Sequence, residues 1–104
     1  MTKTIRVAAI QARRRTISYK VGTAEEAMKR VQANLDELTA LAECAAEQGC
    51  HIIAFPEDTL GTLEWEAAHW GEVDNLLLPA EQAMRTRFGE VAAKYGISLI
   101  CCND

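Results

Sequence analysis

His51-Ile52-Ile53-Ala54-Phe55-Pro56-Glu57-Asp58 is the stretch that decides the fold of this 104-residue chain. The apolar run that ends at Phe55 is typical of a strand buried along its length in a parallel sheet. A proline and a carboxylate follow at once, so the strand delivers Glu57 to the rim of the sheet. Because α/β proteins place their chemistry at the carboxyl ends of their strands, Glu57 is the candidate functional residue.

Two further strands and two helices are predicted around this stretch. Ile5–Gln11 indicates a first strand, and Lys94–Ile100 repeats a pattern of helix, glycine and strand. Thr23-Ala24-Glu25-Glu26 has the S/T-x-x-E form of a capping box, which opens a helix. An apolar stripe at intervals of three and four follows it, and Gly49 ends the helix. The stripe consists of Met28, Val31, Leu35, Leu38, Ala42 and Ala45.

The second helix is expected to begin after Pro79 and to end at Gly96. The chain is therefore an α/β protein with the order β-α-β-α-β. Its strands are apolar on both sides, so both faces of the sheet need cover. Helices on opposite faces would make a small doubly wound domain, whereas helices on one face would leave the other to pack against something outside this sequence. The buried side of the second helix is expected to carry Met84, Phe88, Val91, Ala92 and Tyr95.

The chain carries the motif Gly-x-x-Ile-Ile-x-Phe-Pro-Glu, which ends at Glu57, and the sequence Tyr-Gly-Ile at residues 95–97. With these motifs, the predicted order of strands and helices resembles the opening of the carbon-nitrogen hydrolase family, the nitrilase superfamily. The resemblance covers nearly the whole chain, apart from Ala12–Lys29 and the loop after Asp58. It implies that residues 1–104 are the N-terminal portion of a carbon-nitrogen hydrolase domain, a nitrilase-like αββα sandwich.

The resemblance also implies a Glu-Lys-Cys triad that acts on non-peptide C–N bonds through a thiol-linked acyl intermediate. Glu57 would be the general base, while the lysine and the cysteine would lie on later strands. The implied substrate is a small-molecule amide, carbamoyl compound or nitrile, and the full-length enzyme would be a homo-oligomer. An amidase or N-carbamoyl hydrolase is preferred, a nitrilase or other branch of the superfamily is the alternative, and the 104-residue piece alone is expected to be inactive.

An acid at the end of a buried strand suits a general base, because partial burial raises a carboxyl pKa from about 4.3 toward neutrality. The alternative interpretation of Glu57 is an exposed side chain in the turn after Pro56. Asp58 receives no catalytic role, because adjacent residues in an extended chain point in opposite directions. Cys101 and Cys102 are interpreted as buried small apolar residues.

No cofactor or metal is expected. Cys44, Cys50 and His51 lie close in the sequence, but their spacing matches no zinc motif. A phosphate-binding loop after the first strand would be rich in glycine, but Gln11-Ala12-Arg13 stands there instead, so no nucleotide phosphate site is predicted. The net charge of −4 argues against a nucleic-acid partner. Arg13-Arg14-Arg15 is interpreted as a solvated basic loop, with an anion or substrate contact as the alternative.

The chain contains neither the ~20 consecutive apolar residues that span a bilayer nor the apolar core of a signal peptide. A cytoplasmic protein with no membrane partner is therefore expected, and four irregularly spaced cysteines fit that compartment.

The segment Asp58–Leu78 is long for a connection and is expected to include a helical turn around Glu64–Trp70. Trp65 and Trp70 either pack over the sheet edge or line a substrate pocket or subunit contact. A competing hypothesis makes the chain a self-contained, non-enzymatic α/β module that binds a partner through this segment.

Overall fold

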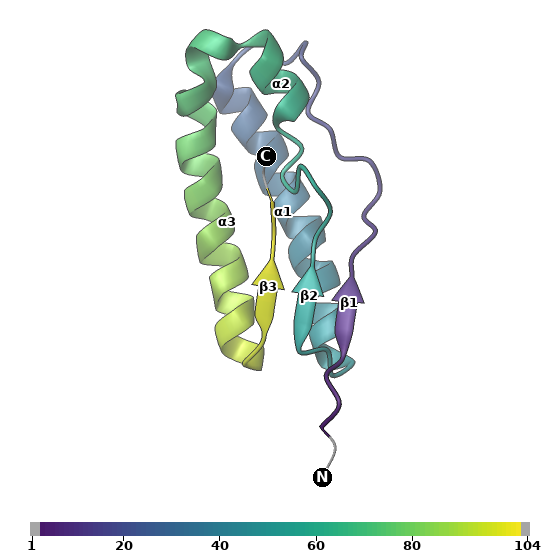
Figure 1. Ribbon diagram of the computed structural model, residues 1–104. Helices are drawn as coiled ribbons and strands as arrows, with labels where there is room; N and C mark the ends of the chain where they lie inside the picture. Colours follow the sequence, from purple (N-terminus) through teal and green to yellow (C-terminus); the bar gives the residue numbers. More distant parts are fainter. Residues whose placement is uncertain (1–2, 103–104) are drawn as a thin grey trace.

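Three short parallel strands and two long helices form the framework of the computed structural model, which describes residues 3–102 (Figure 1). Central strand β2 hydrogen-bonds both neighbours, so the strand order is β1-β2-β3, and Ile53 pairs in register with Ala8 and Leu99. In chain order the elements are β1 (Val7–Ala9), α1 (Ala24–Glu47), β2 (Ile52–Ala54), α2 (Leu63–Ala68), the 3₁₀ helix η1 (Trp70–Glu72), α3 (Val73–Tyr95) and β3 (Ser98–Ile100).

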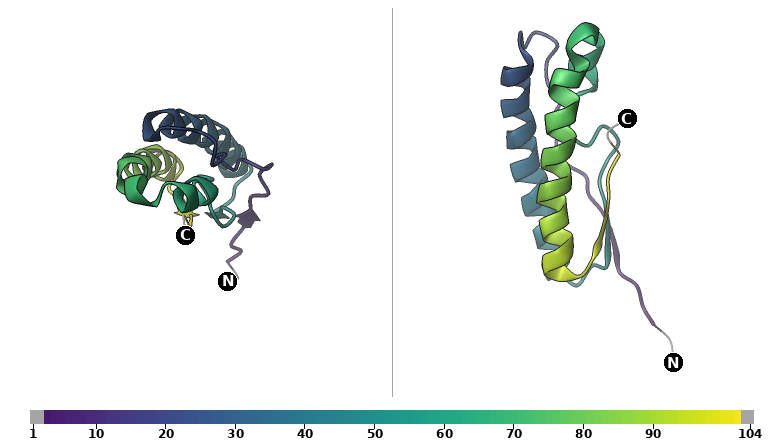
Figure 2. Two further views of the ribbon diagram at one scale, coloured as in Figure 1. Left: turned by 90° about the horizontal axis from the view of Figure 1, so that it is seen from above. Right: turned by 90° about the vertical axis from the view of Figure 1, so that its left-hand side faces the viewer.

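Helices α1 and α3 lie side by side on one face of the sheet (Figure 2). Both crossovers step across the sheet in the same direction, from β1 to β2 and from β2 to β3. Crossovers of one hand that step in one direction place their helices on the same face. The predicted α/β order is therefore confirmed, and of the two alternatives the shared face is correct and the doubly wound domain is wrong.

Helix α1 follows the sequence prediction closely. The Thr23 hydroxyl accepts a hydrogen bond from the Glu26 N–H at 3.1 Å, which is the first half of the predicted capping box. The apolar stripe is buried between α3 and the sheet, with Met28 only partly covered. Gly49, at φ +87°, reverses the chain into β2.

Replacing Thr23 by alanine is expected to lower the free energy of unfolding by about 1 kcal/mol, because the Glu26 N–H loses its only side-chain acceptor at the cap. Urea unfolding at dilute protein, followed by the fluorescence of the buried Trp65, measures this. Thr86→Ala, at an exposed position within α3, is the control and should leave stability unchanged or slightly higher. Equal losses in the two variants would contradict the capping role.

Helix α3 begins at Val73, so its predicted start after Pro79 is wrong. Pro79 lies in the second turn, where it removes one helical hydrogen bond to the carbonyl of Asn75. Asn75 is exposed, so water can satisfy that carbonyl, while Leu76 and Ala80 are fully buried and hold this turn against the core. Packing therefore carries the helix through a residue that usually starts one.

The predicted end of α3 is confirmed. Gly96 has the left-handed φ of +63° and its N–H bonds the carbonyl of Ala92. Met84, Phe88 and Val91 are buried as expected, while Ala92 and Tyr95 are partly covered.

The sheet face opposite the helices exposes apolar side chains to solvent. Ile5, Val7 and Ile100 are 65%, 61% and 57% exposed. Alternation along the strands places them opposite Ala8, Ile53 and Leu99, which face the helices. We call this surface the open face, defined by Ile5, Val7, Ala9, Ile52, Ala54 and Ile100.

Candidate functional site

Glu57 lies just past the carboxyl end of the central strand. The Phe55 N–H makes the last sheet bond, to the carbonyl of Ile100 at 2.8 Å, and the Phe55 ring stacks on Phe88 of α3 with centroids 4.6 Å apart. Pro56 then turns the chain out of the sheet. Glu57 is exposed, and within residues 3–102 its carboxylate has no hydrogen bond or ion pair.

The position of Glu57 therefore agrees with the sequence prediction, but its surroundings do not supply the partial burial expected of a general base. By exposure alone, Glu57 fits the alternative interpretation of a side chain in a turn. Among residues 3–102, the structure places the Glu57 carboxylate at the rim of the sheet and leaves it open to solvent.

Arg15, from the segment after β1, holds the loop that carries Glu57. Its Nε donates to the Thr59 carbonyl at 2.7 Å, and its Nη2 donates to the carbonyls of Asp58 at 2.8 Å and Glu57 at 3.2 Å. The side chain is partly buried against the loop. A single guanidinium thus gathers three consecutive carbonyl oxygens at the rim of the sheet.

Asn34 and Gly61 bring the segment after β1 against this loop. The Asn34 Nδ2 donates to the carbonyls of Arg15 at 2.9 Å and Leu60 at 2.8 Å, and the Ile17 N–H donates to the Gly61 carbonyl at 2.8 Å. Gly61 has φ +77°, and a Cβ on it would stand 2.3 Å from the Arg15 carbonyl oxygen. Only glycine fits at position 61, because any Cβ there would collide with the Arg15 carbonyl oxygen.

Thr59 joins the same loop to the chain after β3. Its N–H donates to the Cys102 carbonyl at 2.9 Å, and its hydroxyl accepts from the Cys102 N–H at 3.1 Å. The hydroxyl also lies 2.9 Å from the carbonyls of Pro56 and Cys102, to which it can donate. Segments that follow all three strands therefore meet around Glu57.

The prediction that Cys101 and Cys102 are buried is only partly right. Cys101 is half-buried on the helix side, where burial, and secondarily the neighbouring Cys102 thiol, raises the pKa of its own thiol. Cys102 is exposed, because the alternation that places Ile100 on the open face places Cys102 on the same side. The Cys101 shift favours the neutral thiol, which is a poor nucleophile.

Asp58 has a structural role, and the extended backbone from which its lack of a catalytic role was predicted is wrong at this position. It adopts a left-handed φ of +51°, a conformation that aspartate tolerates better than most residues. Its Oδ1 accepts from the N–H groups of Thr62 at 3.0 Å and Leu63 at 3.3 Å. The carboxylate thereby accepts hydrogen bonds from two N–H groups at the start of α2.

The helical turn predicted around Glu64–Trp70 is confirmed by α2 and η1, and its two tryptophans differ. Trp65 is fully buried, its Nε1 donates to the Val21 carbonyl at 2.8 Å, and its ring stacks on His69 with centroids 4.2 Å apart. Trp70 is 80% exposed. Packing is thus the role of Trp65, whereas Trp70 contributes little to the core.

The basic cluster Arg13–Arg15 has three different environments. Arg13 pairs with Glu37 at 3.0 Å, Arg14 is exposed, and Arg15 bonds the loop described above. The solvated interpretation therefore fits Arg14 best and is wrong for Arg15. Arg15, Asn34, Thr59 and Gly61 are the residues that sequence reasoning missed, and only Gly61, a glycine three residues after an aspartate, carried a local turn signal.

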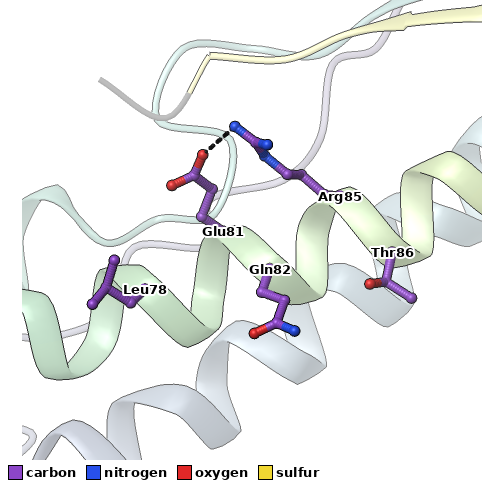
Figure 3. A pocket seen from close by; sticks show the side chains of 5 residues that line it. All are labelled: Leu78, Glu81, Gln82, Arg85 and Thr86. Atoms are coloured by element: carbon purple, nitrogen blue, oxygen red, sulfur yellow. Dashed lines mark hydrogen bonds and ion pairs between the residues drawn. The ribbon is translucent and has the colours of Figure 1, made fainter.

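Other polar features of residues 3–102 lie away from this rim. His51 lies at the amino end of β2, where its Nδ1 accepts from the Arg6 N–H, and no group of three or more metal-ligating side chains is found among these residues. A hollow on α3 is lined by Leu78, Glu81, Gln82, Arg85 and Thr86 and includes no residue of the Glu57 loop (Figure 3). Its Glu81–Arg85 pair, 2.7 Å apart, spans one helical turn.

None of the helices in the described part of the chain has the length and apolar content that crossing a membrane requires. Comparison of the chain with protein-family models, with curated proteins and with solved structures found no match. The geometry at the carboxyl end of β2 is therefore the basis of the functional inference.

Proposed function

We propose that this chain is the N-terminal part of a carbon-nitrogen hydrolase of the amidase or N-carbamoyl hydrolase type, with Glu57 as its general base. The observation that carries the proposal is the place of Glu57, next to the carboxyl end of the central parallel strand, where segments from all three strands converge. Sheets of this kind present their functional side chains at that end. A nitrilase or another branch of the superfamily is the alternative within the same chemistry.

In the proposed reaction the Glu57 carboxylate takes the proton of a cysteine thiol, and the thiolate attacks the carbonyl carbon of the substrate. The C–N bond breaks, the leaving amine accepts that proton from Glu57, and a thioester forms. Glu57 then takes a proton from water, whose oxygen attacks the thioester; the C–S bond breaks, the acid is released, and the proton returns from Glu57 to the cysteine thiolate. The cysteine and the oxyanion-stabilising lysine come from sequence outside these 104 residues, so the chain by itself is inactive.

The open face supports the same proposal. A contiguous apolar surface on a sheet is normally covered by another layer. In the proposed αββα sandwich a second sheet would cover the open face and close over the rim, which would give Glu57 the cover that it lacks. The small-molecule amide or carbamoyl substrate and the homo-oligomeric full-length enzyme belong to this proposal, and the cytoplasmic location stays a prediction.

The reading frame after codon 104 tests the proposal. We expect an in-frame continuation that encodes a lysine after a further strand and a cysteine after another. A stop codon at this point in several independent isolates would contradict the enzyme.

A non-enzymatic module is the second candidate, and one observation favours it. Trp70 and Leu63, both in the segment between β2 and α3, are 80% and 48% exposed, as expected of a surface that binds a partner. The stop codon described above would favour this module over the hydrolase.

The isolated chain is expected to self-associate through the open face, because exposed apolar sheet surface and free strand edges both promote association. Analytical ultracentrifugation should show oligomers or aggregates, and the double variant Val7→Lys, Ile100→Lys should shift them toward monomer. Leu78→Lys is the control, since Leu78 is 65% exposed but lies on α3. A monodisperse, cooperatively melting monomer would count against the sandwich.

A further inference from the structure

The loop that carries Glu57 is held by one side chain from a distant part of the sequence. Arg15 lies 42 residues before Glu57, yet its guanidinium donates to the carbonyls of Glu57, Asp58 and Thr59. We propose that Arg15 is a positioning residue for Glu57, fixing the backbone from which the carboxylate projects. This inference rests on the proposed role of Glu57 as general base.

Three consecutive carbonyls do not converge on one cation in an extended strand. In an extended strand successive carbonyl oxygens alternate in direction, whereas here the left-handed Asp58, at φ +51°, turns them to one side. Oxygens gathered in this way repel one another, and a positive guanidinium removes that repulsion. Residues in such conformations persist where the surroundings hold them, and they cluster at functional sites.

The contact uses the fork geometry of arginine. Nε bonds Thr59 while Nη2 bonds Asp58 and Glu57, so two nitrogens at a fixed separation define the spacing of the loop. The single ammonium of a lysine has no such fixed pair of donors. Arg15 therefore sets both the charge and the geometry of the turn.

Arg15 is itself anchored to the core. Asn34, on α1, donates to the Arg15 carbonyl and to that of Leu60, and Gly61 lies so close to the Arg15 carbonyl that no side chain fits between them. Leu35, the next residue on α1, is fully buried. A rigid path thus runs from α1 through Arg15 to Glu57, the kind of support that a precisely placed functional group needs.

The two neighbouring arginines make different contacts, so the proposed role of Arg15 can be distinguished from a general effect of positive charge in this segment. Arg13 reaches the carboxylate of Glu37, and Arg14 is exposed with no side-chain bond within the described residues. Arg14→Gln therefore removes the same charge from the adjacent position without touching the loop. It is the matched control for Arg15→Gln.

Hydrogen exchange measured by mass spectrometry on the full 104-residue chain tests the structural half of the inference. Arg15→Gln should raise exchange in residues 57–62 by about 10-fold or more while the centre of α1 stays protected, because the loop opens locally. Arg15→Lys should give an intermediate rise, and Arg14→Gln none. Unchanged exchange in residues 57–62 of Arg15→Gln would overturn the proposal.

Kinetics of the complete enzyme test the functional half. A misplaced base lowers kcat more than it raises KM, so Arg15→Gln should lose about 10- to 100-fold in kcat per folded molecule, with partial rescue in Arg15→Lys. A merely structural contact would lower the yield of folded protein and leave kcat alone. Full activity of Glu57→Gln would overturn the proposed function and this role with it, whereas an inactive Glu57→Gln beside an Arg15→Gln of normal kcat would overturn the role of Arg15 alone.

Discussion

Replacing Glu57 by glutamine is expected to lower the kcat/KM of the proposed full-length hydrolase by about 10²- to 10⁴-fold, the contribution typical of a general base. Glutamine has nearly the same shape but cannot take up the proton of the attacking thiol. Because Glu57 is exposed and its carboxylate has no partner within residues 3–102, the fold should not change. The loss therefore reports chemistry, and circular dichroism should show unaltered helix content.

Two further variants sharpen this result. Glu90→Gln, at an exposed carboxylate on α3, is the matched control and should keep full activity. Glu57→Asp keeps a carboxylate as proton acceptor, but its side chain is shorter by one methylene group. Its activity is therefore expected to lie between those of the wild type and Glu57→Gln. Wild-type rates in Glu57→Gln would remove Glu57 from the reaction.

Replacing Gly61 by alanine is expected to lower the free energy of unfolding by about 2 to 5 kcal/mol, the sum of a left-handed backbone for alanine and an overpacked contact. Gly61 has φ +77°, and the new Cβ would stand 2.3 Å from the Arg15 carbonyl oxygen. That oxygen belongs to backbone held by Asn34 and Ile17, so it cannot move aside easily.

Gly89 provides the opposite case in the same chain. It lies inside α3 with no heavy atom within 4 Å of the position that a Cβ would take, so Gly89→Ala should raise stability by about 1 kcal/mol. Urea unfolding of both variants, followed by Trp65 fluorescence at dilute protein, compares them directly. A Gly61→Ala variant as stable as Gly89→Ala would show that the loop does not press against the segment after β1.

The parts of the fold that follow from local chemistry could be predicted from the sequence. The Thr23 cap and the left-handed glycines at positions 49 and 96 mark helix ends through interactions within a few residues. The start of α3 could not be predicted in this way, since Pro79 is a strong local signal that the burial of Leu76 and Ala80 overrides.

In the candidate site, too, local features could be predicted from the sequence and long-range contacts could not. The place of Glu57 could be predicted because an apolar strand followed by a proline leaves few other possibilities. The role of Arg15 could not, because its partners are 42 to 44 residues away and no pattern in the sequence links them. The exposure of Cys102 was not predicted for a related reason, because whether a sheet face is covered depends on how all the helices and strands pack together.

The bonds between Thr59 and Cys102 have a consequence for synthesis on the ribosome. While translation has reached only α3, the backbone groups of Cys102 that Thr59 binds have not yet been made, although α1, which packs in the core, is already complete. Chains fold from the N-terminus as they emerge. The bonds that join this loop to the chain after β3 therefore form only once Cys102 has left the exit tunnel, whereas Arg15 and Asn34 can hold the turn at Glu57 earlier.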